Sequence, residues 1–269
     1  MKIYLAGGFG NNLFQLYLVN LLRKKGVSVD LFSNLTEKNI ITSLLGWTIH
    51  ENELSKLRIT TKKESLPIFL LDFLKLSFSK LLGSPFMNAY YDSNNTKTLF
   101  KEEFLDKLIR NNIISGYFQY SELLSLGELE EFKRIYFAEL SLDKKLHTCL
   151  HLRGGDLINE NIKLLDFYRR AIDYLDVKEV NIISNDKNLV KLFTQANKDL
   201  KLSVISSQSP LNDFMNMANC ENLICSKSTF SLWSGLIGSQ NFVILPENKK
   251  INFYDNDAPL ELSKKFKIL

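Results

Sequence analysis

The chain has 269 residues, of which 45% are hydrophobic and 24% charged, so it can form one large globular domain or two small ones. Its net charge is only +4, and no basic cluster is interleaved with aromatic residues, which argues against a nucleic-acid-binding protein. The three cysteines have no paired spacing, which argues against a disulfide framework and for a reducing compartment. With three histidines in the chain, a zinc site is a weak expectation.

The first 33 residues predict the opening of an α/β unit. Residues 2–6 (KIYLA) have the pattern of a short strand, 7–12 (GGFGNN) of a glycine turn, 13–26 of an apolar helix and 27–33 of a second strand. Strand, turn, helix and strand in this order are typical of a parallel sheet. The glycines follow the first strand too early for a signal peptide or a membrane anchor, so we expect a cytoplasmic protein.

Residues 36–135 form a variable middle region that contains one long apolar stretch, 66–86. Asp72, Lys75 and Lys80 interrupt this stretch, and its apolar residues recur at helical spacing, which predicts an amphipathic helix and not a membrane span. We interpret it as a helix packed on its own domain, with contact to a membrane surface as the alternative. A charged helix is expected at 122–137.

A second run of strands and helices begins near residue 147. Strands are expected at 147–152, 180–186, 203–207, 222–226 and 242–246. The segments between them predict helices at 166–175, 187–197, 210–220 and 227–239, whereas 246–269 has the polar pattern of a loop-like tail. Two successive α/β halves with a break near 143 predict two Rossmann-like domains facing a cleft, 1–143 and 144–269.

The GGFGNN turn is a candidate anion site, because the backbone N–H groups at the start of a helix favour negative charge. The dinucleotide fingerprint fails at its third glycine, which is Leu13 here, and no Gly-Lys-Ser/Thr follows as in a P-loop. A phosphate cradle and a tight structural turn both remain open.

HLRGGD (151–156) places an arginine where a buried strand ends. Strand ends in open α/β sheets line the ligand crevice, and an arginine there can bind a phosphate with two parallel hydrogen bonds. Asp156 can orient the Arg153 guanidinium, and His151 faces the same side of the strand as Arg153. The alternative is a structural Arg–Asp pair that closes a turn.

SKSTFSLWSG (226–235) is a third turn from a strand into a helix, where Ser228 or Thr229 can cap and free amides can meet an anion. Plain helix capping explains this segment equally well. Three such turns, one with an arginine, can converge on a single diphosphate. Asp255 and Asp257 have the spacing of a metal-binding DxD, but they lie in the polar tail, where a solvated turn is the better interpretation.

Five short segments resemble the motifs of one family, in the same order along the chain. GGFGNN is similar to its GG-x-GNQ opening and GYFQ (116–119) to a middle-domain signature. HLRGGD is similar to H-x-R-R-x-D, ISND (183–186) to a later S-D-D segment, and residues 218–235 to a motif ending in N-S-S/T-F-S-W-W. The family is that of the α1,2-fucosyltransferases, glycosyltransferase family 11, with a more distant resemblance to the α1,6- and protein O-fucosyltransferases.

The resemblance implies a GT-B fold, with residues 1–143 on the acceptor side and 144–269 binding the nucleotide-sugar donor. It implies an inverting transferase that uses GDP-fucose and needs neither a metal nor another cofactor. Arg153 would bind the β-phosphate and, with Asp156, serve catalysis, while His151 would lie against the nucleoside. The other donor-binding residues that it implies are Gly8, Phe9, Gly10 and Asn11, which close on the donor, Asn185 and Asp186 near ribose or sugar, Asp213 on guanine, and Ser228 and Thr229 on the phosphates.

The chain departs from the family pattern at two site positions. The second arginine of the pair is Gly154, and the glutamine after Gly-Asn is Asn12. Our leading hypothesis is transfer of fucose to a galactose-type hydroxyl of a bacterial surface glycan, with an acceptor that can be lipid-linked and a protein that can rest on the inner face of the membrane. The alternatives are a transferase with another nucleotide-sugar donor and a catalytically silent nucleotide-sugar-binding protein.

Overall fold

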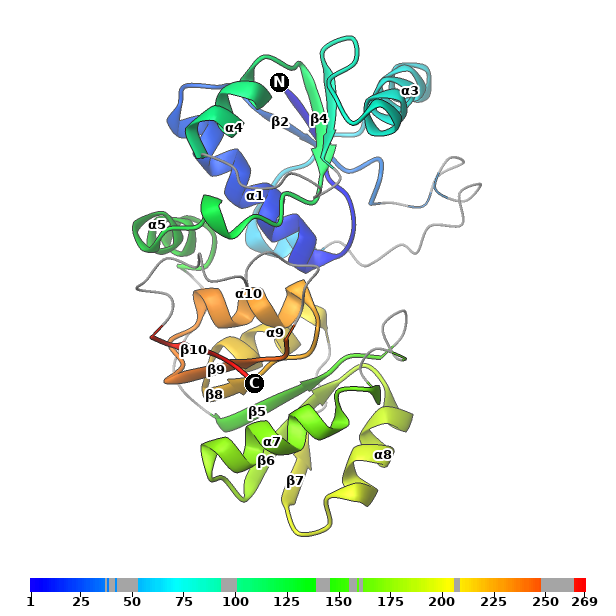
Figure 1. The fold of residues 1–269 in the computed structure, drawn as a ribbon. Helices are drawn as coiled ribbons and strands as arrows, with labels where there is room; N and C mark the ends of the chain where they lie inside the picture. Colours follow the sequence, from blue (N-terminus) through cyan, green and yellow to red (C-terminus); the bar gives the residue numbers. More distant parts are fainter. Residues whose placement is uncertain are drawn as a thin grey trace. The chain divides into compact units, whose positions relative to one another are not determined.

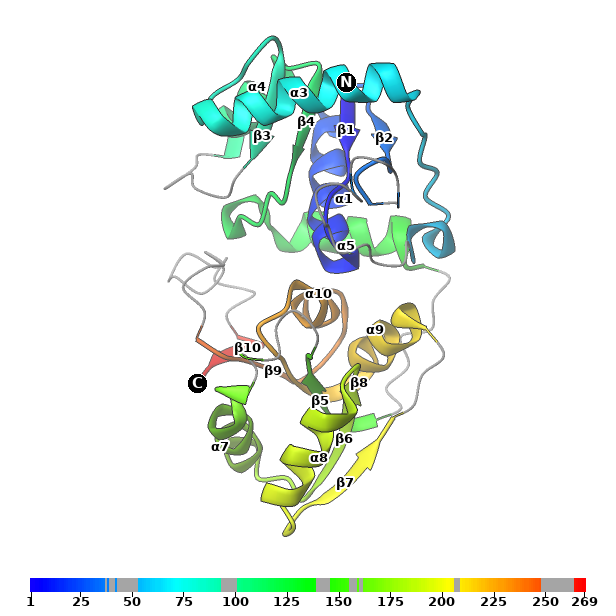
Figure 2. The ribbon, with the colours of Figure 1, turned by 90° about the vertical axis from the view of Figure 1, so that its right-hand side faces the viewer.

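Figures 1 and 2 show the protein as a computed structural model. The residues that the structure describes are 1–36, 38, 42, 53–92, 101–138, 146–154, 159, 162–205, 209–247 and 264–269. They divide into two compact units, Met1–Leu124 and Ser125–Leu269. Each unit has its own sheet of parallel strands, as two Rossmann-like domains require.

The first unit is built on a four-stranded sheet in the order β2-β1-β4-β3. Its strands are β1 (Lys2–Tyr4), β2 (Asp30–Phe32), β3 (Ala89–Asp92) and β4 (Ile113–Gly116). Its described helices are α1 (Phe9–Lys24), α3 (Leu66–Leu82) and α4 (Lys101–Ile109), with the 3-10 helices η1 (Glu53–Leu57) and η2 (Ser121–Leu123). Because apolar residues occupy all sides of α1, that helix is buried along nearly its whole length.

The middle region contributes two strands, β3 and β4, that the sequence pattern did not predict. β4 pairs with β1 on one side and with β3 on the other, so it is an interior strand. Strands of four residues are too short to show a clear alternation of apolar and polar residues. A Cβ at Gly116, where φ is 141°, would lie 2.5 Å from the Cβ of Asp92, so the approach of the two strands requires glycine there.

The second unit is built on a six-stranded parallel sheet in the order β10-β9-β8-β5-β6-β7. Its strands are β5 (Leu146–Leu152), β6 (Glu179–Ser184), β7 (Lys201–Val204), β8 (Cys220–Ile224), β9 (Phe242–Leu245) and β10 (Phe266–Ile268). Its described helices are α5 (Leu126–Tyr136), α7 (Leu165–Leu175), α8 (Lys187–Ala196), α9 (Pro210–Ala218) and α10 (Thr229–Ile237). The alternation of strand and helix predicted from residue 147 is confirmed.

The end of the chain is not the loop that its polar composition predicted, because Phe266–Ile268 forms β10 beside β9. The adjacent Lys265 ammonium donates to the carbonyl oxygens of Gly235 and Gly238, at 2.6 and 2.5 Å. These carbonyls end α10, where a cation is favourable, although burial lowers the pKa of Lys265 to about 8. A strand of three residues is too short to show a periodic signal in the sequence, and the contact that holds it joins residues about 30 positions apart.

The compact units divide after Leu124, whereas the sequence placed the break near residue 143. The helix α5 therefore belongs to the second unit and not to the first. Its buried residues include Phe132, whose ring centroid lies 5.3 Å from that of Trp233 on α10. An aromatic contact between residues so far apart in the chain is invisible to a reading of local patterns.

The helix predicted within residues 66–86 is present as α3, but many of its apolar side chains do not pack on its own unit. Leu70, Leu74, Leu81 and Leu82 are each more than 40% exposed. The buried residues of the helix are Phe69, Asp72, Leu76 and Ser79. In the part of the chain that the structure describes, no helix has the length and hydropathy to cross a bilayer.

Asp72 ties α3 to the first strand of the sheet. Its buried carboxylate accepts a hydrogen bond from the Tyr4 hydroxyl at 2.8 Å and pairs with the Lys2 ammonium at 3.1 Å. Lys2 also pairs with Glu64 at 2.6 Å. Burial and the neighbouring Asp72 carboxylate both raise the pKa of Tyr4, so its hydroxyl keeps the proton that it donates.

We expect Asp72→Ala to lower the free energy of unfolding by about 2 kcal/mol, because it leaves the buried Tyr4 hydroxyl without its acceptor. Urea unfolding measures the change. The control is Asp30→Ala, which removes an exposed ion pair with Lys62 and should leave the stability nearly unchanged. Equal effects of the two substitutions would show that the buried contact does not hold α3.

Candidate functional site

The order of strands in the second unit creates a topological switch point between β5 and β8. The chain proceeds from β5 outward to β6 and β7, and then returns to place β8 on the other side of β5. At such a point the connections leave the sheet in opposite directions, and the carboxyl ends of the two strands are the usual place for a ligand. Arg153 follows β5 directly, and residues 225–228 lead from β8 into α10.

His151, near the end of β5, is buried beside this switch point. Its Nδ1 lies 2.8 Å from the Ser226 hydroxyl, and its ring centroid lies 5.8 Å from that of Phe230. Burial, with a smaller contribution from the Arg153 guanidinium, lowers the pKa of His151 to about 3. The imidazole is therefore neutral at physiological pH, and Arg153 brings the positive charge to the end of β5.

Ser228 is the N-cap of α10, with its hydroxyl accepting the N–H of Phe230 at 3.2 Å. Thr229 is the first residue of the helix. The capping interpretation of this segment is thus confirmed for Ser228. The same helix start also turns its first-turn amides toward the end of the sheet, where they favour an anion.

The loops after β5 and β6 are hydrogen-bonded to each other. The Gly154 N–H donates to the side-chain oxygen of Asn185 at 2.9 Å, and the Ser184 hydroxyl donates to the Leu152 carbonyl at 2.7 Å. Asp186 caps α8, because one of its carboxylate oxygens accepts two backbone N–H groups of the first turn, at 2.9 and 3.0 Å. Asn185 and Asp186, predicted to approach a ribose or sugar, thus shape the loops around Arg153.

The structure explains why position 154 is glycine. A Cβ at Gly154 would lie 2.3 Å from the Cβ of Asp186 and 2.4 Å from one of its carboxylate oxygens. No real Cβ contact is that short, so any larger residue at position 154 must displace the cap of α8. The second arginine of the resembled motif is therefore incompatible with Asp186 in its present place.

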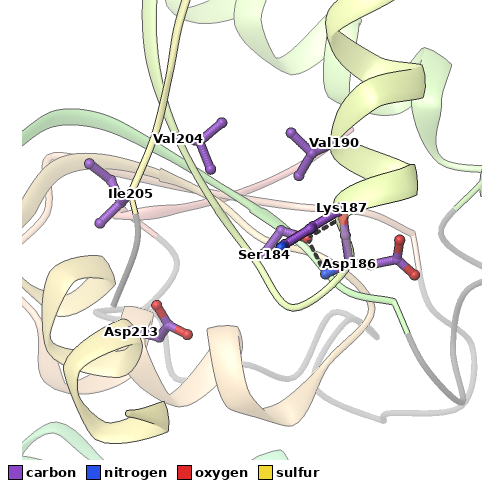
Figure 3. Close-up of a pocket in the computed structure, with 7 residues that line it drawn as sticks. All are labelled: Ser184, Asp186, Lys187, Val190, Val204, Ile205 and Asp213. Atoms are coloured by element: carbon purple, nitrogen blue, oxygen red, sulfur yellow. Dashed lines mark hydrogen bonds between the residues drawn. The ribbon is translucent and has the colours of Figure 1, made fainter. Parts of the chain in front are cut away.

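A pocket of about 370 Å³ lies beside these loops, at the ends of β6 and β7. Figure 3 shows Ser184, Asp186 and Lys187 on one side, Asp213, from α9, on another, and the apolar side chains along a third. The apolar lining residues are Val190, Val204 and Ile205. Apolar walls with a few polar groups at the edge are typical of a small-molecule site.

In the first unit, GGFGNN and GYFQ lie together, because β1 and β4 are neighbouring strands. The amide of Gln119 donates to the side-chain oxygen of Asn11 at 2.8 Å. Gly7 needs its φ of 77°, and a Cβ there would lie 2.4 Å from the Asn11 amide nitrogen. α1 begins at Phe9 and not at residue 13, so Phe9, Gly10 and Asn11 form its first turn, with Gly8 as N-cap.

Two residues that the sequence did not single out hold these loops. Gln15, fully buried on α1, bonds both N–H and C=O of Ala6 at 3.1 Å and the Gly116 carbonyl at 2.5 Å. Asp92, at the end of β3, accepts the Phe118 N–H at 3.0 Å and the Tyr120 hydroxyl at 2.5 Å. A polar residue inside an apolar helix and an acid at the end of a strand were the signals available in the sequence.

Some predicted positions lie outside the described residues: Asp156, Asp255 and Asp257. Within the ranges that are described, no three His, Cys, Asp or Glu side chains form a group that could hold a metal ion. Cys149, Cys220 and Cys225 are buried and free.

Comparison with solved structures supports the GT-B fold. The heptosyltransferase WaaC of E. coli, solved with ADP, is similar over 100% of this chain and 92% of its own, with a TM-score of 0.50 and 8% identity. At that identity the likeness concerns the fold alone. The fucosyltransferase NodZ from Bradyrhizobium gives a TM-score of 0.46 at 12% identity, over 88% of this chain and 93% of that one.

Comparison of sequences identifies the family. The chain is 26% identical to the O-antigen biosynthesis glycosyltransferase WbnK of Escherichia coli, over 96% of this chain and 97% of that protein. The pattern of glycosyl transferase family 11 matches residues 68–261, which include the middle-domain, HLRGGD, ISND and C-terminal segments. Because this match covers well over half of the chain, the protein belongs to glycosyl transferase family 11 and is a glycosyltransferase.

Proposed function

We propose that the protein transfers L-fucose from GDP-fucose to a galactose-type hydroxyl, with inversion, an α1,2 linkage and no metal ion. Its acceptor is a precursor of a bacterial surface glycan. Family membership supports the reaction class, and the similarity to an E. coli glycosyltransferase named for O-antigen biosynthesis supports the acceptor class.

The observation that carries the proposal is the position of Arg153 at the switch point of the second sheet, next to the start of α10. Transfer from a nucleotide-sugar leaves negative charge on the departing diphosphate and oxocarbenium character on the sugar. The guanidinium and the start of α10, at Ser228 and Thr229, are the groups that accept this charge. One well-placed donor of this kind contributes about 3 kcal/mol to the transition state.

The pocket at the ends of β6 and β7 suits the nucleoside. Guanine presents its N1–H and its exocyclic amine side by side, and one carboxylate can accept from both. Asp213 supplies that carboxylate, while Val190, Val204 and Ile205 contact the flat faces of the base and the ribose. His151, which contacts Ser226 and Phe230 and does not line this pocket, lies against the nucleoside in the resembled family, and its neutral imidazole adds no charge.

The remaining roles follow the resemblance. We assign Gly8, Phe9, Gly10 and Asn11 of the first unit to donor binding, as the resemblance implies. Asp156 orients the Arg153 guanidinium or assists the acceptor hydroxyl.

Release of the nucleoside diphosphate from a panel of nucleotide-sugars, with and without galactosides, tests the proposed donor. We expect GDP release from GDP-fucose, stimulated by a galactoside, and far slower release from GDP-mannose, UDP-sugars and ADP-heptose. Turnover of another donor would leave the proposed transferase activity standing and would show that GDP-fucose is not its donor. No turnover with any donor, together with binding of GDP, would indicate a silent binding protein.

Arg153→Ala should lower turnover by at least about a hundredfold without unfolding the protein, because it removes the positive charge that Arg153 brings to the end of β5. Arg153→Lys keeps the charge and loses the paired hydrogen bonds, so we expect an intermediate rate. The control is Arg169→Ala on α7, which removes surface contacts with Asp173 and Asp199 and should leave the rate unchanged. Wild-type turnover in Arg153→Ala would remove the main support for the mechanism.

Gly154→Ala should raise the KM for the donor by about tenfold or more, because the new Cβ must displace Asp186 and with it the loop beside Arg153. Steady-state kinetics with varied GDP-fucose measure the effect. The matched control is Gly127→Ala on α5, where an added Cβ meets no atom within 4 Å. Equal KM values for the two variants would contradict the role given to the contact between residues 154 and 186.

The low pKa of His151 predicts a loss of stability in mild acid. Between its ordinary pKa of 6.5 and about 3, the unfolded chain binds a proton at this residue and the folded chain does not. The free energy of unfolding should therefore fall as the pH drops below 6.5, by at most about 1.4 kcal/mol per pH unit from this group. Urea unfolding at several pH values from 7 to about 5 measures this dependence. The free energy of unfolding should change less steeply with pH in His151→Gln than in the wild type. An equal dependence on pH would show that the histidine titrates normally.

A further inference from the structure

The helix α3 has an apolar surface on the side that faces away from its own unit. Of the 18 large hydrophobic side chains that are exposed among the described residues, eight belong to this one helix: Leu66, Ile68, Leu70, Leu71, Leu74, Phe78, Leu81 and Leu82. We call this set the α3 outer face. Figures 1 and 2 both place α3 at the outside of the first unit, with described elements on one side of it only.

The outer face is wide. At about 100° per residue, its eight side chains cover an arc of roughly 200° around the helix axis. The arc also contains Pro67, Ser77 and Lys75 but no acidic residue, since Asp72, the one acidic residue of α3, is buried and paired with Lys2. Exposed fractions run from 41% at Leu70 to 80% at Leu81, so these side chains are not covered by their own unit.

The width and charge of this surface decide between the partners that could cover it. A partner helix covers a stripe of about 100°, so a second copy or another protein would have to wrap both flanks of α3. A bilayer surface covers the whole arc of a helix that lies in its plane. Lys75 and Lys80 lie near opposite margins of the arc. Lys75 can keep its ammonium group among lipid phosphates while the leucines enter the acyl region. The Lys80 ammonium lies 4.9 Å from the centroid of the Tyr91 ring and adds its charge from the other margin.

We propose that the α3 outer face docks the protein on an anionic lipid bilayer, with α3 parallel to the membrane plane. This inference rests on the surface of the first unit and is independent of the proposed donor and acceptor. The leucines provide the apolar contact, and the two lysines provide the preference for anionic lipid. The helix does not cross the membrane, because it has 17 residues and its sheet-facing side carries Asp72 and Ser79.

Sedimentation of the full-length protein with lipid vesicles tests the proposal. We expect strong binding to phosphatidylcholine vesicles that contain phosphatidylglycerol, weaker binding to phosphatidylcholine alone, and a decrease at high salt for the anionic vesicles only. A protein that stays in the supernatant with both kinds of vesicle would overturn the proposal.

Two sets of substitutions assign the binding to α3. Leu71→Gln, Leu74→Gln and Leu81→Gln together should lower binding to both kinds of vesicle by more than about tenfold, because they remove apolar contact without changing the charge. Lys75→Gln and Lys80→Gln should each lower binding to anionic vesicles by about fivefold and leave binding to phosphatidylcholine vesicles unchanged. Glutamine favours a helix nearly as well as leucine, so the thermal unfolding temperature should be retained and is measured for each variant.

The matched control is Leu192→Gln on α8, which replaces a leucine of comparable exposure, 46%, in the second unit. It should bind vesicles like the wild type. If the triple variant also binds like the wild type, the membrane contact lies elsewhere and the inference fails. If the wild type is a dimer without lipid, and the triple variant a monomer by light scattering, the face belongs to a second copy of the chain and the bilayer proposal is overturned.

Discussion

The carboxyl edge of the second sheet depends on one constraint, which is that the chain must come back from β7 to pair β8 with β5. Connections on the two sides of β5 then leave in opposite directions, which makes the carboxyl ends of β5 and β8 the usual place for a ligand. Arg153 and the first turn of α10 occupy the two sides of this space. Burial keeps His151 neutral beside them, so the electrostatics of the edge are set by a guanidinium and a helix start.

Around this edge, most of the polar side chains in the recognised segments hold the backbone. Asn185 and Asp186 use side-chain oxygens on the backbone amides of neighbouring loops, and Ser228 does the same at α10. In the first unit, Gln15 gives the same support to the end of β1. Such bonds keep the ends of parallel strands at fixed separations, which is what a site for a rigid nucleotide needs.

The departure at position 154 illustrates how closely these loops are packed. An arginine there would add a second cation to the donor site, but Asp186 occupies the volume that its Cβ needs. The protein therefore has a glycine where the resembled motif has its second arginine, beside the aspartate that caps α8. Under the proposed function, a single guanidinium and the start of α10 accept the charge of the diphosphate.

In α3, polar residues lie on the buried side and apolar residues on the exposed side, which is the opposite of the usual distribution. Its buried side includes Asp72 and Ser79, and both are hydrogen-bonded, so the desolvation of polar groups is compensated within the unit. Its exposed side is almost entirely apolar. Exposure of this apolar side to water is unfavourable. A partner that covers the apolar arc removes the surface from water, and that burial stabilises the complex.

The sequence by itself determined the α/β class, the order of strands and helices from residue 147, the existence of a helix within residues 66–86 and the candidate positions at Arg153 and His151. These features depend on periodicity and on the point where an apolar run ends, and both are local in the chain. Only the tertiary structure decided that β4 is an interior strand, which side of α3 is buried, and that Asp186 fills the space beside Gly154. Each of these depends on contacts between residues 24 to 111 positions apart, from the pair Ala89–Ile113 to the pair Lys2–Ile113, and local pattern carries no information about such pairs.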